Sequence, residues 1–94
     1  MKFAEPSKLD FTVYTKSGCR NCSKAKALLN EYDFNYSLIE CDEYLLEHRD
    51  EFLRFMCEKA ECEVQSFPIV FHDGVYIGGY LETKRYVETF LSFF

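Results

Sequence analysis

Apolar and polar residues alternate along the first half of the chain in a way that predicts a strand, a helix and a second strand. Phe11–Thr15 is rich in β-branched and aromatic residues, as strands are. Apolar residues then recur every three or four positions over Arg20–Tyr32, which is typical of a helix. After a turn, Tyr36–Cys41 has the composition of a second strand. A unit of this length implies a right-handed crossover between two parallel strands.

A longer helical pattern follows. Asp42 is placed to cap its first turn, and we expect the helix to span Glu43–Lys59. The residues expected to face the core are Leu45, Phe52, Phe55 and Met56.

The last part of the chain predicts a hairpin and a final helix. Asp73-Gly74 separates two apolar runs, Pro68–His72 and Val75–Ile77, which is a strong signal for antiparallel strands. The final helix is expected over about Leu81–Ser92. Its expected core residues are Tyr86 or Val87, Phe90, Leu91 and Phe94. The order β-α-β-α-β-β-α favours an α/β fold, one mixed four-stranded sheet with helices on both faces.

Composition limits the class of protein. The 94 residues are enough for one domain, expected over residues 11–94 after a short polar lead-in over residues 1–10. No apolar run is long enough for a membrane span or for the core of a signal peptide, so we expect a protein that stays where it is made and has no membrane partner. Five cysteines, an odd number, argue against a closed disulfide framework and favour a reducing cytoplasm.

Charge is unevenly distributed along the chain. The net charge of −5 makes nucleic acid an unexpected partner. Between Lys16 and Lys26 there are four cations and no acid, whereas Glu40 to Glu51 holds six acids and one arginine. A basic patch on an acidic protein suggests a small anionic substrate. For Lys24 and Lys26 we favour the simpler interpretation, a solvated helix face.

The residues with the clearest chemistry are Cys19 and Cys22, which lie where the first strand turns into the first helix. A helix N-terminus favours an anion, and the thiolate is the reactive form of cysteine. Lys16 and Arg20 add two cations nearby. We therefore expect Cys19 to be the nucleophile, with a lowered pKa, and Cys22 to resolve its mixed disulfides. A pair of buried thiols or a zinc knuckle would use the same spacing.

Two further motifs could complete a site around this pair. Ser66-Phe67-Pro68 opens a predicted strand, where proline is tolerated; local sequence favours a trans peptide before it. Gly78-Gly79 precedes the last helix, where backbone N–H groups could approach a ligand or simply form a turn.

Taken in order, these three motifs resemble the glutaredoxins, a family with the thioredoxin-like fold that reduces disulfides and glutathione mixed disulfides. The resemblance covers roughly Phe11 to Phe94. It implies a glutathione-dependent thiol–disulfide oxidoreductase with Cys19 as nucleophile and Cys22 as resolving thiol. It also implies that glutathione is the co-substrate, that disulfide-containing proteins are clients, that no metal is needed, and that the protein is a monomer.

The resemblance also implies which residues bind glutathione. Phe67–Pro68 would be a cis peptide whose backbone pairs with the glutathione cysteine, and Lys16 would face its glycine carboxylate. Glu82 stands where the family usually has Asp and would meet the ammonium group. The full expected set is Lys16, Arg20, Ser66, Phe67, Pro68, Gly79, Tyr80, Leu81 and Glu82. The chain departs from the family's usual Pro-Tyr between the cysteines, from Thr-Val before the proline, and from a small polar residue at Leu81.

The sequence leaves three alternatives to a glutathione-dependent oxidoreductase open. One is a glutathione-assisted iron–sulfur cluster module that uses Cys19. Another is a redoxin served by thioredoxin reductase. The third is a zinc site made by Cys19, Cys22, Cys57 and Cys62. Outside such a site we interpret Cys41, Cys57 and Cys62 as ordinary thiols in preference to a regulatory Cys57–Cys62 disulfide, and His48 and His72 as surface residues.

Overall fold

The computed structural model describes residues 2–64 and 66–92 and confirms the predicted order of elements, with the middle helix in two pieces. The elements are β1 (Phe11–Thr15), α1 (Arg20–Glu31), β2 (Tyr36–Glu40), α2 (Asp42–Glu47), α3 (Arg49–Ala60), β3 (Ile69–His72), β4 (Val75–Gly78) and α4 (Tyr80–Leu91).

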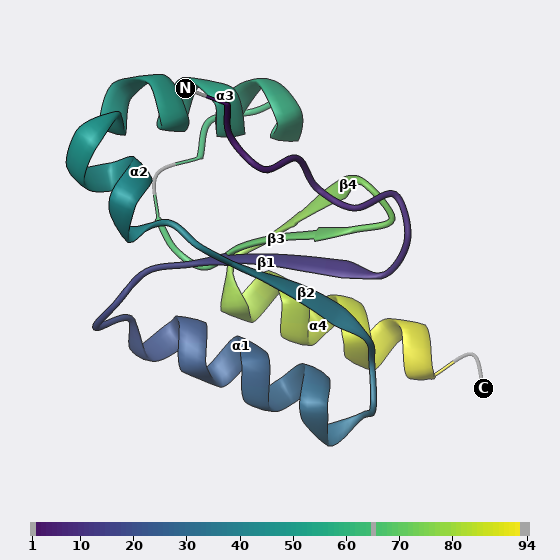
Figure 1. Ribbon diagram of the computed structural model, residues 1–94. Helices are drawn as coiled ribbons and strands as arrows, with labels where there is room; N and C mark the ends of the chain where they lie inside the picture. Colours follow the sequence, from purple (N-terminus) through teal and green to yellow (C-terminus); the bar gives the residue numbers. More distant parts are fainter. Residues whose placement is uncertain (1, 65, 93–94) are drawn as a thin grey trace.

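The strands form one mixed sheet in the order β2-β1-β3-β4. β1 is parallel to β2 and antiparallel to β3, and β4 is antiparallel to β3. Asp73 and Gly74 both have positive φ, which confirms the tight hairpin expected from this pair. Helices α1 and α4 cover one face of the sheet, and α2 and α3 lie on the other (Figure 1). The sheet is therefore covered on both faces, as the sequence predicts.

Alternation along the two central strands divides the core into two clusters, because successive side chains of a strand point to opposite faces. The α1-side cluster consists of Phe11, Val13, Leu28, Leu29, Val70 and Val87. The α3-side cluster consists of Tyr14, Cys41, Phe52, Met56, Val64, Ile69 and Phe71. The sheet separates the two clusters.

The middle helix is not continuous. His48 leaves the helical conformation with φ −141° and ψ 46°, so α2 ends at Glu47 and α3 begins at Arg49. The expectation of one continuous helix over Glu43–Lys59 is therefore wrong, because the chain leaves the helical conformation at His48. No glycine or proline marks the break. The chain changes direction between α2 and α3, and α2 lies close to the end of β2 (Figure 1). Phe52 and Met56 of α3 are fully buried in the α3-side cluster.

Three other expectations need correction. The side chain of Asp42 does not cap the helix; Cys41 precedes α2 and makes no side-chain cap bond. Phe90 was expected in the core, but it is 37% exposed, whereas Val87 is fully buried. His72 is not a surface residue, because its ring stacks on Phe11 with centroids 4.2 Å apart and hydrogen-bonds the Tyr86 hydroxyl. Phe94 lies outside the described residues.

Residues 2–10 form no helix or strand, yet they pack against the α3 side of the molecule. The ring of Phe3 lies edge-on to Tyr44 and Phe52, with centroids 4.9 and 5.3 Å away. The Tyr14 hydroxyl donates to the Ala4 carbonyl, and the Ala4 N–H donates to the Tyr44 hydroxyl. These contacts make the described part of the segment a cover for the α3-side cluster.

Across residues 2–64 and 66–92, none of the helices combines the length and the apolar character that crossing a bilayer requires.

Candidate active site

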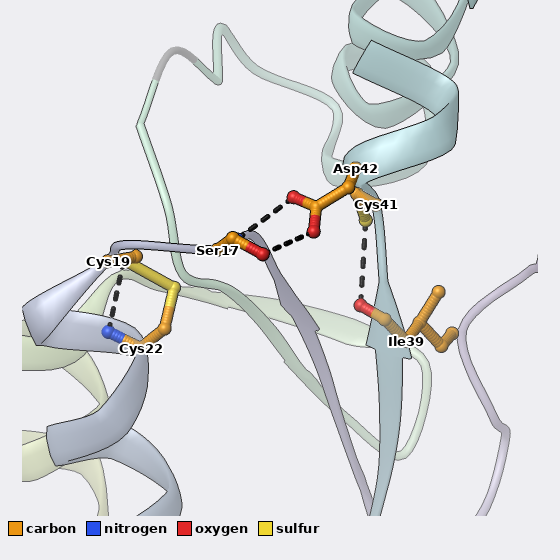
Figure 2. Close-up of a disulfide and its surroundings, with 6 residues drawn as sticks. All are labelled: Ser17, Cys19, Cys22, Ile39, Cys41 and Asp42. Atoms are coloured by element: carbon orange, nitrogen blue, oxygen red, sulfur yellow. Dashed lines mark hydrogen bonds between the residues drawn. A yellow bond between two sulfur atoms is a disulfide. The ribbon is translucent and has the colours of Figure 1, made fainter. Parts of the chain in front are cut away.

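The two cysteines of the motif form a disulfide at the N-terminus of α1 (Figure 2). Cys19 is the residue that precedes the helix, and its Sγ accepts a hydrogen bond from the Cys22 backbone N–H at 3.1 Å. Cys19 is partly exposed, whereas Cys22 is only 2% exposed. An incoming sulfur compound can therefore reach Cys19 and not Cys22.

A short loop, residues 16–18, connects β1 to this pair, and we call it the active-site loop. Gly18 adopts a left-handed conformation with φ 70°, which glycine does at little cost. Nothing lies within 4 Å of a Cβ placed there, so the backbone angle and not crowding favours glycine. The turn at Gly18 brings Cys19 to the start of α1.

An open hollow of about 570 Å³ borders the disulfide. This active-site hollow is lined by Thr15, Lys16, Ser17, Gly18, Cys19, Arg20, Cys22, Ser23, Lys26, Glu40 and Asp42. Its basic residues come from the active-site loop and α1, and its acidic residues come from the end of β2 and the start of α2. The two oppositely charged stretches of the sequence thus meet beside the reactive sulfur atoms. Lys26, expected on a solvated face, belongs to this hollow.

Asp42 contacts the active-site loop, which sequence reasoning missed. Its carboxylate accepts hydrogen bonds from the Ser17 N–H at 2.9 Å and from the Ser17 hydroxyl (Figure 2). These two bonds, and then the nearby charge of Lys16, hold the pKa of Asp42 below its usual value. The carboxylate is therefore ionised at neutral pH.

The second motif lies beside the active-site loop. Phe67–Pro68 is a cis peptide, as the family resemblance implies and against the local preference for trans. Lys16 Nζ lies 5.6 Å from the centre of the Phe67 ring, which is within the range of a cation–π contact. Pro68 is buried and Ser66 is exposed. The structure thus brings Lys16 and Phe67 together, as expected for one site.

The third motif lies next to Pro68. A Cβ placed on Gly79 would be 3.6 Å from the Pro68 carbonyl oxygen, and one on Gly78 would be 2.6 Å from Cβ of Glu82. Glu82 turns back to its own helix start, where its carboxylate accepts from the Gly79 N–H at 2.9 Å. Glu82 thus stabilises the backbone turn before α4. Since one of its oxygens makes this bond, any ligand would have to share the carboxylate with the turn.

A second hollow of about 350 Å³ connects these residues. It is lined by Glu63, Val64, Ser66, Tyr76, Gly79 and Glu82. Leu81 lines neither hollow and is 59% exposed. Tyr80 lies at the start of α4, with Lys24 Nζ 5.7 Å from its ring centre. Four of the residues expected to bind glutathione thus line neither hollow: Phe67, Pro68, Tyr80 and Leu81.

The other cysteines have different surroundings. Cys41 is fully buried, its Sγ donates to the Ile39 carbonyl at 3.5 Å, and burial raises its pKa to about 12. Cys57 Sγ accepts from the Val64 N–H at 3.3 Å. Cys57 and Cys62 are free thiols, so the structure contains no disulfide between them. Among the residues that the structure describes, no three His, Cys, Asp or Glu side chains are grouped to hold a metal, so the four cysteines of the zinc alternative are not brought together.

The fold and this site define a dithiol redox protein of the thioredoxin class: a C-x-x-C disulfide at a helix N-terminus, beside a cis-proline at the start of a central strand. The glutaredoxin family model matches residues 11–77. The chain belongs to the glutaredoxin family.

Relatives and solved structures agree with this assignment. Glutaredoxin 1 of Rickettsia felis is 33% identical over 67 residues, which are 71% of this chain and 61% of that protein. The mitochondrial glutaredoxin-2 of Rattus norvegicus is 29% identical over 73 residues, 78% of this chain but 44% of the relative. The matched region is thus less than two thirds of either relative. The crystal structure of glutaredoxin 1 from Francisella tularensis complexed with cacodylate has a TM-score of 0.76 at 27% identity, and the match covers 87% of this chain and 95% of that one.

Proposed function

We propose that this protein is a glutathione-dependent thiol–disulfide oxidoreductase that reduces both glutathione mixed disulfides and protein disulfides. The observation that carries the proposal is the unequal exposure of a disulfide at the N-terminus of α1, with Cys19 accessible and Cys22 buried. A nucleophile that meets substrate and a resolving thiol that does not are the two parts that such a reaction needs.

With a glutathione mixed disulfide, the Cys19 thiolate attacks the glutathione sulfur. The bond between Cys19 and glutathione forms as the bond to the client breaks, and the client leaves as a thiolate that takes up a proton. A second glutathione thiolate then attacks the sulfur of the bound glutathione. This step forms glutathione disulfide and releases Cys19 as a thiolate. The client sulfur is reduced from disulfide to thiol and the sulfur of the second glutathione is oxidised from thiol to disulfide. The transferred glutathione sulfur stays at the disulfide level, so the electrons balance.

With a protein disulfide, Cys19 attacks one client sulfur and Cys22 then attacks Cys19. The second step releases the reduced client and leaves the Cys19–Cys22 disulfide, the form present in this structure. Two glutathione molecules return the pair to the dithiol. Because Cys22 lies one helical turn from Cys19, this resolving step is intramolecular.

For glutathione we propose a position along Lys16, Arg20, the cis-peptide segment Ser66-Phe67-Pro68, and the start of α4 from Gly79 to Glu82. Three observations support one continuous surface: Lys16 lies over Phe67, the backbone of Gly79 runs close to the Pro68 carbonyl, and the Gly79 N–H bonds to Glu82. The edge of the cis peptide would pair with the glutathione backbone, and Lys16 would attract a carboxylate. Tyr80 and Leu81 would border the γ-glutamyl end.

Turnover of a small glutathione mixed disulfide with glutathione and glutathione reductase tests this function. We expect turnover that depends on glutathione. A protein that is reduced only by thioredoxin reductase, or one that is purified coloured by an iron–sulfur cluster and does not turn over, would contradict it. We further propose a cytoplasmic monomer, because the odd number of cysteines fits a reducing compartment. Cell fractionation and gel filtration test that part separately.

A further inference from the structure

The side chain of Asp42 hydrogen-bonds to the active-site loop, although Asp42 belongs to a different element. Both bonds end on Ser17, one at the N–H and one at the hydroxyl. Ser17 is exposed, and Gly18 beside it has a left-handed conformation that glycine can leave easily. Ser17, two residues before the nucleophile, is thus held by a side chain from outside its own segment.

This contact continues the pairing of the two parallel strands. The last backbone bond in this direction runs from the Cys41 N–H to the Thr15 carbonyl at 2.8 Å. Beyond this bond the strands separate. Ser17 and Asp42 each lie two residues past the last paired residues, Thr15 and Glu40, and the Asp42 side chain reaches across to Ser17 (Figure 2). The loop is held at its middle, with Lys16 on one side and Cys19 two residues away on the other.

We propose that Asp42 is a positioning residue for the redox site, whose carboxylate fixes the active-site loop through Ser17 so that Lys16 and Cys19 are held ready for glutathione. The inference rests on the proposed function for its substrate. It adds a residue from α2 to a site otherwise made of the β1–α1 connection, the cis-proline strand and the start of α4.

The charge of Asp42 alone would act in the opposite direction. A carboxylate near Cys19 disfavours the thiolate, so removing it would promote ionisation of the thiol if charge were its only effect. Lys16 of the loop, Arg20 and Lys26 of α1, and Glu40 of β2 line the same hollow and also contribute to the field there. The two roles thus predict effects of opposite sign on reactivity.

The test compares Asp42→Ala, Asp42→Asn, Ser17→Ala and the Asp42→Ala/Ser17→Ala double variant in the glutathione assay. Glu43→Gln is the matched control, because Glu43 is an exposed carboxylate in the same first turn of α2 and lines neither hollow. We expect each Asp42 variant to lower kcat/KM about 3- to 10-fold, the scale of one net hydrogen bond. Glu43→Gln should leave it unchanged. The double variant should lose less than the product of the two single losses.

A direct readout separates positioning from charge and from misfolding. In Asp42→Asn the pKa of the Cys19 thiol, followed by thiolate absorbance, should not fall, and the melting temperature should stay close to that of the parent because both residues are exposed. A lower Cys19 pKa, unchanged or higher kcat/KM, fully multiplicative losses, or an equal loss in Glu43→Gln would overturn the proposal. If the parent protein shows no glutathione turnover, the proposed function fails. The positioning role of Asp42 is then judged by the rate at which iodoacetamide alkylates Cys19 in the reduced protein, which should be slower in Asp42→Asn.

Discussion

The backbone N–H of Cys22 donates to Sγ of Cys19 across the first turn of α1 at 3.1 Å. When the disulfide is reduced, the same N–H can stabilise a thiolate on Cys19, together with the helix N-terminus and the charges of Lys16 and Arg20. Cys22, inside the helix and buried, has none of these advantages.

We therefore expect Cys19 to ionise at a lower pH than Cys22. Thiolate absorbance against pH, measured for reduced Cys22→Ser and Cys19→Ser proteins, gives the two values separately. A Cys19 thiol that stays protonated at neutral pH would contradict this expectation.

The two cysteines should also separate by role. Cys19→Ser should remove essentially all turnover of a glutathione mixed disulfide. Cys22→Ser should keep substantial turnover of that substrate, since a second glutathione can resolve the intermediate, and should lose most reduction of a protein disulfide. Equal loss on the glutathione substrate would indicate a dithiol cycle of the thioredoxin kind. If both variants kept their activity, another cysteine would be the nucleophile.

Lys16 is exposed and lies over the Phe67 ring, so its contribution to glutathione binding should be modest and electrostatic. Lys16→Ala should raise KM for the glutathione mixed disulfide about two- to fivefold, with less effect on kcat. The difference should shrink in high salt. Lys8→Ala, an exposed lysine of the N-terminal segment, is the control and should leave KM unchanged. An effect independent of salt would rule out the charge as its cause.

The α3-side cluster gives a prediction for stability. Met56 is fully buried there, so Met56→Ala should lower the free energy of unfolding by about 2–5 kcal/mol through lost burial and the cavity left behind. Leu46→Ala, on the neighbouring α2 with a side chain 84% exposed, should change it by about 0.5 kcal/mol or less. Urea unfolding of the two variants measures both changes in the free energy of unfolding. Equal losses would show that α3 is not packed as described.

Alkaline pH should destabilise the fold partly through Cys41. Its pKa rises from 9.0 to about 12 on burial, so above about pH 9 the unfolded chain releases a proton that the folded chain retains. Stability should then fall with increasing pH across this window. Tyr14, whose pKa burial also raises, adds a similar slope. Cys41→Ala should keep the tyrosine part and lose the cysteine part, which melting curves between about pH 8 and pH 11 would reveal as a shallower decline. An unchanged slope would assign the effect elsewhere.

The sequence predicts the sheet and the redox motif well because both depend on short-range patterns. The apolar run at Phe11–Thr15, the Asp73-Gly74 turn and the spacing of Cys19 and Cys22 each determine local geometry within a few residues. The cis state of Phe67–Pro68 is different. Local sequence favours the trans form, and only the resemblance to a family pointed to the form observed.

Features that depend on distant residues were missed. The break at His48 has no glycine or proline beside it to signal it, and α3 after it buries Phe52 and Met56. Aspartate is a common helix-capping residue, but the carboxylate of Asp42 instead accepts a hydrogen bond from Ser17, 25 residues away in the sequence. A register argument could have found this pair, because parallel β1 and β2 end at the same edge and each residue lies just beyond one of those ends. His72 shows no sequence signal for its place among aromatic rings.

The sheet also separates two core clusters whose contributions to stability should be nearly independent. Since the α1-side and α3-side clusters do not share members, substitutions in one should add to substitutions in the other, as distant sites do. Core residues of α4 could therefore diverge without a compensating change in α3. The bond between Ser17 and Asp42 is an exception, because it joins a loop leading into α1 to the first residue of α2. At this edge of the sheet, a substitution at Asp42 in α2 should therefore affect the reactivity of Cys19 on the other side.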